Sequence, residues 1–176
     1  TVAAKTLTPI SNTKSQSFLI IEDDAKYYSP LLQALEKLGH KVRIAMNHDE
    51  AREIIKSSEG FDAIFCDAQT STMYEGKDIG SRFTASHFLH KKHNQNATGE
   101  LTPIISMSGI EEYNEKMCGM QSLNGGAACK SSKCELFNRV RNDMGSVVSA
   151  TVKEDALETV LRDLGNAVDM AARLRF

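Results

Sequence analysis

Six polar residues of this chain stand directly behind short apolar runs, where a folded protein could gather them into one site. The apolar runs are 18–21, 61–66, 103–107 and 127–129. The polar residues behind them are Glu22, Asp23, Asp24, Asp67, Ser108 and Lys130. If each run is a strand of an open parallel sheet, the six residues meet beyond the carboxyl ends of the strands, where such sheets bind ligands.

Carboxylates crowded at such an edge repel one another unless a hard cation lies between them. Mg²⁺ suits this all-oxygen environment and often acts beside phosphate groups. The Lys130 ammonium and the Ser108 hydroxyl would then be donors for an incoming anion. A carboxylate held beside Mg²⁺ and a lysine can attack a phosphoryl group and form an aspartyl phosphate. The pattern therefore predicts a magnesium site with phosphoryl-transfer chemistry.

Strand and helix patterns alternate along the chain. Continuous apolar runs predict buried strands, and the last of the five is short and weak. The five strands are expected at 18–21, 42–45, 61–66, 103–107 and 127–129. Helical spacing or caps predict helices near 31–38, 47–55, 79–89, 111–123 and 133–144. This alternation predicts an α/β fold, a doubly wound parallel sheet with helices on both faces.

Composition narrows the functional classes. The chain has 176 residues, 41% hydrophobic and 25% charged, which indicates one globular domain. A net charge of −2 gives no basic face for nucleic acid. No apolar run is long enough to span a membrane. Four cysteines without CxxC spacing favour reduced thiols and a cytoplasmic location.

The segments FLIIEDD, FDAIFCD, PIISMSG and CKSS together resemble the receiver domain of bacterial two-component response regulators, as in chemotaxis regulators. The resemblance covers about residues 18–144 and includes the spacing between strand ends. It implies a flavodoxin-like five-stranded sheet in the order 2-1-3-4-5. It also implies phosphorylation by a histidine kinase or phosphotransfer protein. Such a domain catalyses its own phosphorylation and dephosphorylation and is a signalling switch, not a conventional turnover enzyme.

The resemblance also implies roles for individual residues. Asp67 would be the phosphoacceptor, and Asp23 a direct Mg²⁺ ligand with Glu22 acting mainly through water. The backbone carbonyl of Gln69 would be a further metal ligand. Ser108 would hydrogen-bond the phosphoryl group and Lys130 would pair with it. Asp24 would have a lesser role.

The chain departs from the family pattern at three places. Ala127 stands where the family has an aromatic residue, and Ser131 where it has a proline. The loop AQTSTMYEG after Asp67 lacks the usual proline. These differences leave the residues expected to bind the phosphoryl group in place. They change the residues by which the family transmits the presence of that group.

An amphipathic segment near the C-terminus predicts an additional helix. We expect a loose leader over residues 1–16, a receiver domain over 17–145 and this helix within 146–176. The apolar residues of the helix recur at about 3.5-residue spacing, which permits a coiled coil. Homodimerisation, signal transmission and packing against the domain itself are the open alternatives. A receiver-like interaction module that works without phosphorylation through this helix is the alternative function.

Three histidines, His87, His90 and His93, lie three residues apart in the predicted third helix. In an α-helix this spacing drifts around the axis. We therefore expect a solvated helix face at these positions in preference to a metal site.

Overall fold

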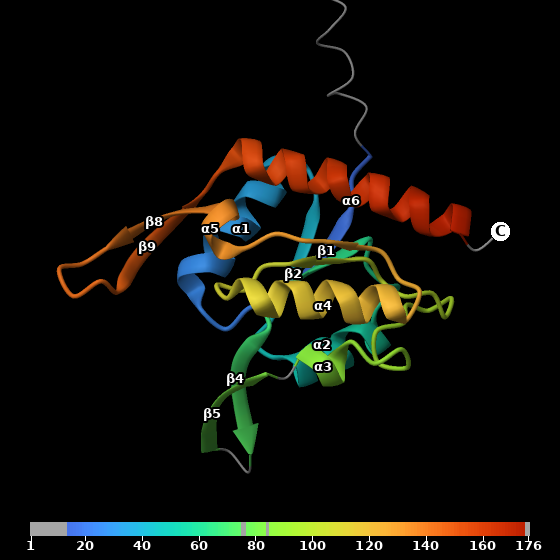
Figure 1. Cartoon of the computed structure of the whole chain (residues 1–176), viewed down its shortest axis with the longest axis horizontal. Coiled ribbons are helices and arrows are strands. Elements are labelled where there is room, and N and C mark those ends of the chain that lie inside the picture. The colour runs from blue at the N-terminus through green and yellow to red at the C-terminus, as the bar shows by residue number, and fades with distance from the viewer. Residues whose placement is uncertain (1–13, 75–76, 84, 175–176) are drawn as a thin grey trace, which may run out of the picture.

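The computed structural model of the protein describes residues 14–74, 77–83 and 85–174. Its centre is a parallel sheet of five strands in the order β2-β1-β3-β6-β7 (Figure 1). The strands are β1 (Ser17–Ile21), β2 (Lys41–Ala45), β3 (Ala63–Cys66), β6 (Ile104–Ser106) and β7 (Ala128–Cys129). This is the predicted order 2-1-3-4-5, so the predicted fold class is confirmed.

Local signals explain the first two helices, α1 (Ala25–Lys37) and α2 (His48–Ser57). Asp24 caps α1 by accepting a hydrogen bond from the Lys26 backbone N–H at 3.0 Å. At α2 the side chain of Asn47 accepts from the Glu50 N–H at 2.8 Å, and the Glu50 carboxylate accepts from the Met46 N–H. These contacts explain why the chain turns into a helix immediately after β1 and β2.

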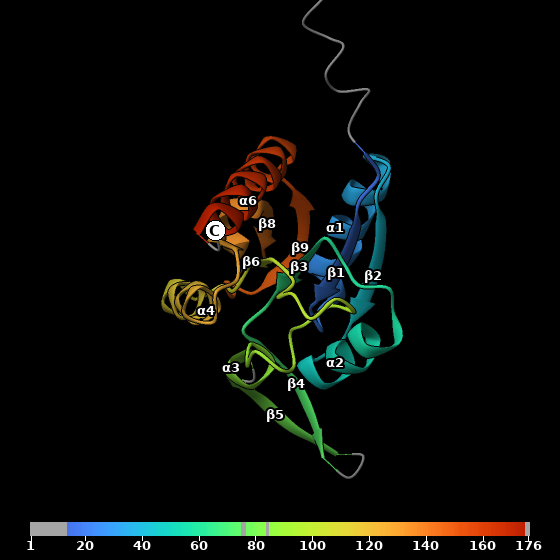
Figure 2. The same cartoon turned by 90° about the vertical axis from the view of Figure 1, so that its right-hand side faces the viewer.

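Two helical layers enclose the sheet (Figure 2). Alternate residues of β1 and β3 face opposite layers because successive strand side chains point to opposite faces. Phe18 and Phe65 pack toward α1 and the C-terminal helix α6 (Glu154–Leu174). Leu19 and Ile64 pack toward α2 and α4 (Glu111–Leu123). Both faces of the sheet are thus buried, as the continuous apolar runs predicted.

The predicted helix over 79–89 is wrong. An antiparallel hairpin, β4 (Gln69–Tyr74) with β5 (Lys77–Phe83), includes the first part of this segment. Only a short helix follows, α3 (Ala85–Phe88). The β-branched and aromatic residues Thr70, Thr72 and Tyr74 favour an extended chain, and pairing with β5 outweighs the helical spacing of Ile79, Phe83 and Leu89.

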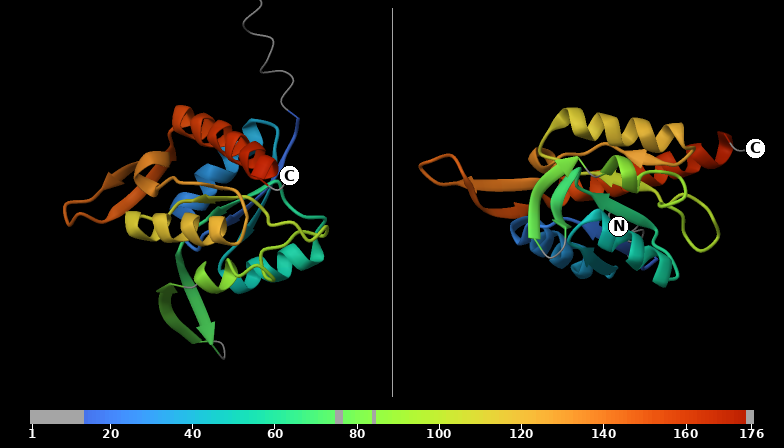
Figure 3. Two further views of the ribbon diagram at one scale, coloured as in Figure 1. Left: turned by 45° about the vertical axis from the view of Figure 1, so that its right-hand side comes forward. Right: turned by 90° about the horizontal axis from the view of Figure 1, so that it is seen from below.

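The predicted helix over 133–144 is also largely wrong. The helix α5 (Lys133–Leu136) is one turn long, and a second antiparallel hairpin follows, β8 (Phe137–Arg141) with β9 (Val147–Val152). The turn residues decide the outcome. Asn142 accepts hydrogen bonds from the Met144 and Ser146 N–H groups, and Gly145 adopts φ of 80°. Both hairpins extend away from the body of the protein (Figures 1 and 3).

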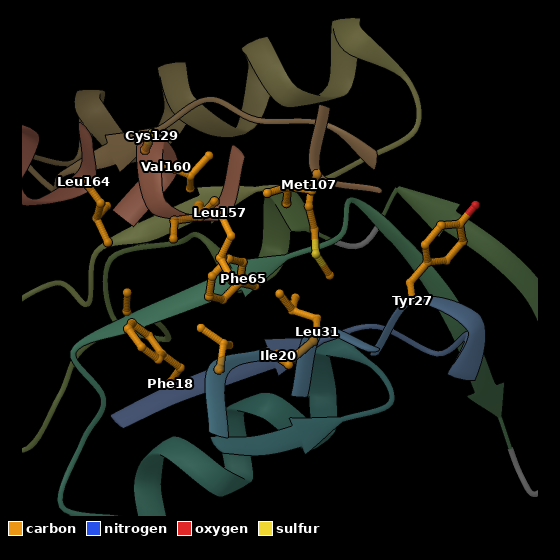
Figure 4. Packing of buried hydrophobic residues seen from close by; sticks show 14 of the residues in the cluster. Phe18, Ile20, Tyr27, Leu31, Phe65, Met107, Cys129, Leu157, Val160 and Leu164 are labelled. Carbon is orange, nitrogen blue, oxygen red and sulfur yellow. The ribbon is translucent and has the colours of Figure 1, made fainter. Parts of the chain in front are cut away.

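The predicted C-terminal helix is present as α6, and it packs against its own domain. Leu157, Val160 and Leu164 lie in one buried cluster with Phe18, Ile20 and Phe65 (Figure 4). Packing within the chain, one of the three alternatives, is therefore the arrangement observed. None of the helices in the described part of the chain combines the length and hydropathy needed to cross a bilayer.

The packing of α6 makes a test of stability possible. Leu157 is 1% exposed and Leu174, on the same helix, is 84% exposed. We expect Leu157→Ala to lower the free energy of unfolding by about 2–5 kcal/mol because it leaves a cavity in the core. The matched change Leu174→Ala should alter it by no more than about 0.5 kcal/mol. Urea denaturation checks both, and equal effects would contradict the packing of α6 as a core helix.

Candidate functional site

Three acidic side chains meet at the carboxyl edge of the sheet. Glu22 directly follows β1 and Asp67 directly follows β3, and the parallel register places Ile21 opposite Cys66. Each of Glu22, Asp23 and Asp67 offers a carboxylate oxygen, and these oxygens lie within 4.8 Å of one another. Glu22 is fully buried and Asp67 is 4% exposed. The acidic cluster expected from the sequence is therefore formed.

One lysine joins this cluster, and it is Lys133. Its Nζ lies 2.8 Å from Oε2 of Glu22 and 3.1 Å from Oδ2 of Asp67. The lysine side chain is 13% exposed, so all three charges are shielded from water. A buried ion pair needs close geometry and further hydrogen bonds to offset the cost of desolvation. Here the N–H groups of Asp24 and Ala68 supply them, donating to Glu22 at 3.1 Å and to Asp67 at 2.8 Å.

The cluster carries an excess of negative charge. Burial and then repulsion by Asp67 raise the pKa of Glu22 to about 8, against the attraction of Lys133. Burial also raises the pKa of Asp67, although Lys133 opposes the shift. Burial disfavours the charge on Lys133, but Asp67 and Glu22 outweigh it and raise the pKa of the ammonium. One lysine is therefore too little positive charge to keep both buried carboxylates ionised at neutral pH.

Three contacts position Lys133. Its backbone N–H donates to the carbonyl of Ser108 at 3.3 Å, which ties the start of α5 to the segment after β6. The Ser132 hydroxyl caps α5 by accepting from the Glu135 N–H at 3.1 Å. The ammonium lies over the ring of Tyr27, 4.5 Å from its centroid, which is a cation–π contact. The Tyr27 ring packs edge-on against Phe137.

The structure does not bring the predicted Lys130 to the acidic cluster. The Lys130 ammonium pairs with Glu111 at 2.5 Å and with Glu115 at 3.6 Å, and its side chain is 45% exposed. Lys130 directly follows β7, as predicted, but Glu111 and Glu115 of α4 hold its ammonium away from the cluster. Lys133, the first residue of α5, reaches Glu22 and Asp67 in its place.

The other predicted residues lie around the same edge. Ser108 is buried, its N–H donates to Asn114 at 2.8 Å, and its hydroxyl oxygen accepts from the Ile110 N–H at 3.1 Å. Gln69 begins β4, two residues beyond Asp67. Asp23 accepts from the N–H and the hydroxyl of Ser71, at 3.0 and 2.8 Å. Asp24 caps α1, which accords with its expected lesser role.

The sequence interpretation missed Lys133, Tyr27 and Ser71. A usable signal existed only for Lys133, because the motif CKSSK contains a second lysine directly behind the helix cap Ser132. Tyr27 lies in α1 and Ser71 in β4, and only the three-dimensional packing brings them to the cluster. At two of the three departures from the family pattern, Ala127 is buried and Ser131 donates its N–H to the Ser106 hydroxyl.

The residues present fit a hard divalent cation. The acidic cluster offers carboxylate oxygens from three residues, and oxygen is the ligand that Mg²⁺ prefers. Oε2 of Glu22 is buried and lacks a hydrogen-bond donor of good geometry among the described residues, although Lys133 lies close to it. A cation here would relieve the repulsion that raises the pKa of Glu22.

No protein-family model matches the chain, and no curated protein matches its sequence. Solved structures do match its fold. The chemotaxis response regulator CheY4 of Vibrio cholerae aligns with a TM-score of 0.58 at 16% identity, over 86% of this chain and 99% of CheY4. The chain has the receiver-domain fold of response regulators.

Two further structures share this receiver-domain fold. The receiver domain of the sensor histidine kinase PA1611 from Pseudomonas aeruginosa gives a TM-score of 0.56 at 15% identity, over 89% of this chain and 99% of that one. Its structure has a magnesium ion coordinated in the active-site cleft. NtrX from Brucella abortus gives 0.55 at 17% identity, over 92% of this chain and 29% of NtrX. At these identities the likeness establishes the fold.

The buried acid Glu22 leads to a pH dependence of stability. Its pKa in the folded protein, about 8, lies above the ordinary value of 4.5, so the folded state binds more protons between these pH values. The contribution of Glu22 to stability is therefore lost as the pH rises toward 8. Between pH 5.5 and 8, the free energy of unfolding should fall by at least about 1 kcal/mol less in Glu22→Gln than in wild type. One pKa unit corresponds to about 1.4 kcal/mol.

Urea denaturation at pH 5.5 and 8 in buffer containing a chelator measures this difference. The raised pKa of Asp67 has the same sign and leaves a residual slope in the variant. Lys133 contributes only at much higher pH, because its raised pKa lies above 10.5. The same loss of stability in both proteins would contradict the raised pKa of Glu22.

Proposed function

We propose that the chain is a phosphorylation-dependent signalling switch that accepts a phosphoryl group on Asp67 in a Mg²⁺-dependent reaction. The observation that carries the proposal is the cluster of Glu22, Asp23 and Asp67 with the Lys133 ammonium 3.1 Å from Asp67. This cluster lies at the carboxyl edge of a receiver-type sheet. It offers an acceptor carboxylate, oxygen ligands for a metal and a fixed positive charge.

The proposed reaction is an in-line displacement at phosphorus. An oxygen of the ionised Asp67 forms a bond to phosphorus while the bond to the donor's leaving group breaks, and the leaving group keeps that electron pair. Lys133 lies near Oδ2 of Asp67 and offsets negative charge on the transferring oxygens. The Ser108 hydroxyl oxygen accepts from the Ile110 N–H, and its own hydrogen is available to donate to the bound phosphoryl group.

Glu22, Asp23, Asp67 and the backbone carbonyl of Gln69 would hold the metal. Bound Mg²⁺ supplies positive charge that neutralises the carboxylates and the phosphoryl oxygens. Ser71 already donates two hydrogen bonds to Asp23, so it fixes the orientation of this carboxylate. The proposed phosphodonor is a histidine kinase or a phosphotransfer protein, and the proposed location is the cytoplasm.

The alternative, a module that binds partners through the C-terminal helix without phosphorylation, is not favoured. Leu157, Val160 and Leu164, from the apolar stripe that such a partner would bind, are buried against the chain's own sheet. Homodimerisation through the helix stays a prediction. Light scattering of the full chain and of the double variant Met170→Ala/Leu174→Ala, which changes exposed apolar residues of α6 and keeps its core contacts, would test it.

Two lysines permit a matched test of the proposal. Wild type incubated with Mg²⁺ and acetyl phosphate should gain the mass of one phosphoryl group, and Asp67→Asn should gain none. Lys133→Gln should slow the reaction by about tenfold or more, since removing one preorganised donor typically costs 10²–10³ in rate. Lys130→Gln, which removes the same charge from an exposed site, should react at nearly the wild-type rate.

Intact-mass spectrometry over a time course gives both rates, and circular dichroism controls for folding. Persistent modification of Asp67→Asn would overturn the acceptor assignment. A wild type that stays unmodified with both acetyl phosphate and beryllofluoride would overturn the proposed function. A greater loss of rate in Lys130→Gln than in Lys133→Gln would reverse the assignment of the lysine.

A further inference from the structure

Three histidines lie close together at the end of α3 and in the turns that follow it. His87 lies in α3, and His90 and His93 lie beyond its last residue, Phe88. The His90 N–H donates to the His87 carbonyl at 3.3 Å, and the His93 N–H donates to the His90 carbonyl at 2.8 Å. These i to i+3 hydrogen bonds close turns, so the α-helix expected from the sequence does not continue through this segment.

The imidazole rings gather around His93. Ring centroids lie 4.8 Å apart for His87 and His93, and 5.8 Å apart for His90 and His93. A Zn–N bond of about 2.0–2.1 Å places the ring centroid of a ligating imidazole about 3.2 Å from the metal. In a tetrahedral site the ring centroids of two such imidazoles therefore lie about 5 Å from each other. The two observed spacings bracket this value.

We propose that His87, His90 and His93 form a binding site for a transition-metal dication that prefers imidazole, such as Zn²⁺ or Ni²⁺. Imidazole nitrogen suits these ions, whereas Mg²⁺ prefers carboxylate oxygen. The site shares no residue with the acidic cluster, and it does not depend on whether Asp67 accepts phosphate.

Binding requires small side-chain movements. Among the described residues, only the acidic cluster already brings ligand atoms from three residues within 4.8 Å of one another. The rings of His87 and His90 are exposed and can rotate to converge on a metal. Partial desolvation, and then the neighbouring side chains of His87 and Arg52, lower the pKa of His93, which favours its neutral form. A neutral imidazole is the form that binds metal.

Arg52 of α2 is a built-in competitor. Its guanidinium contacts Nε2 of His87 and also pairs with Asp49. A metal bound to Nε2 of His87 must displace the arginine, which can keep its pairing with Asp49. We therefore expect Arg52→Gln to bind the metal more tightly than wild type, because one competing positive charge is removed.

A titration of the full chain with Ni²⁺ tests the site in the presence of excess Mg²⁺, which fills the acidic cluster. We expect one Ni²⁺ per chain by calorimetry. Paramagnetic broadening in NMR spectra should affect the imidazole protons of His87, His90 and His93 most strongly and spare those of His40. This readout also separates imidazole from thiolate binding, since cysteine ligands would not broaden these three rings most strongly.

Matched variants complete the test. Loss of even a supporting partner usually weakens metal binding by about 10–100-fold, so His93→Gln should cost at least about tenfold and His87→Gln/His93→Gln should abolish binding. Lys92→Gln, in the same exposed turn, should bind at least as tightly as wild type. Undiminished binding by the double variant would overturn the proposal. Sharp His87, His90 and His93 signals at saturating Ni²⁺ would also overturn it.

Discussion

The structure of the acidic edge depends on one buried ammonium group shared by two carboxylates. Lys133 lies within 3.1 Å of both Glu22 and Asp67, which come from neighbouring strands of the sheet. Without this charge the two acids would be buried side by side with no balancing cation among the described residues. Burial and then repulsion by Asp67 raise the pKa of Glu22 in spite of Lys133. This repulsion is what favours a dication at the same edge.

The position of Lys133 in turn depends on unusual local structure. The edge strand β7 has two residues and α5 has four, so the segment between α4 and β8 is held mostly by individual contacts. The Ser108 carbonyl, the Ser132 cap and the Tyr27 ring each fix part of it. Tyr27 belongs to α1, and its neighbour Phe137 begins the β8–β9 hairpin, so the hairpin is linked to the acidic edge through two packed rings.

Much of the fold was predictable because its signals are local and strong. The buried strands β1, β3 and β6 are continuous apolar runs, and Asn47 with Glu50 marks the start of α2. The two hairpins were missed because a helical spacing of apolar residues over 79–89 and 133–144 competed with turn and strand preferences. For 133–144, the Asn142 side-chain hydrogen bonds and Gly145 decide the conformation, and these are turn contacts that hydrophobic periodicity does not reveal.

The acidic residues of the site were predictable for the same reason, since each follows a strong strand. The lysine was not, because Lys130 and Lys133 are close in sequence and contacts with distant elements decide between them. Glu111 and Glu115 hold Lys130, and Tyr27 contacts Lys133. The most direct measurement is a crystal structure with Mg²⁺ and beryllofluoride, a phosphoryl mimic. The account predicts beryllofluoride on Asp67 within hydrogen-bond distance of Lys133 Nζ, with Lys130 still paired with Glu111. Beryllofluoride bound elsewhere, or contacted by Lys130 in place of Lys133, would contradict it.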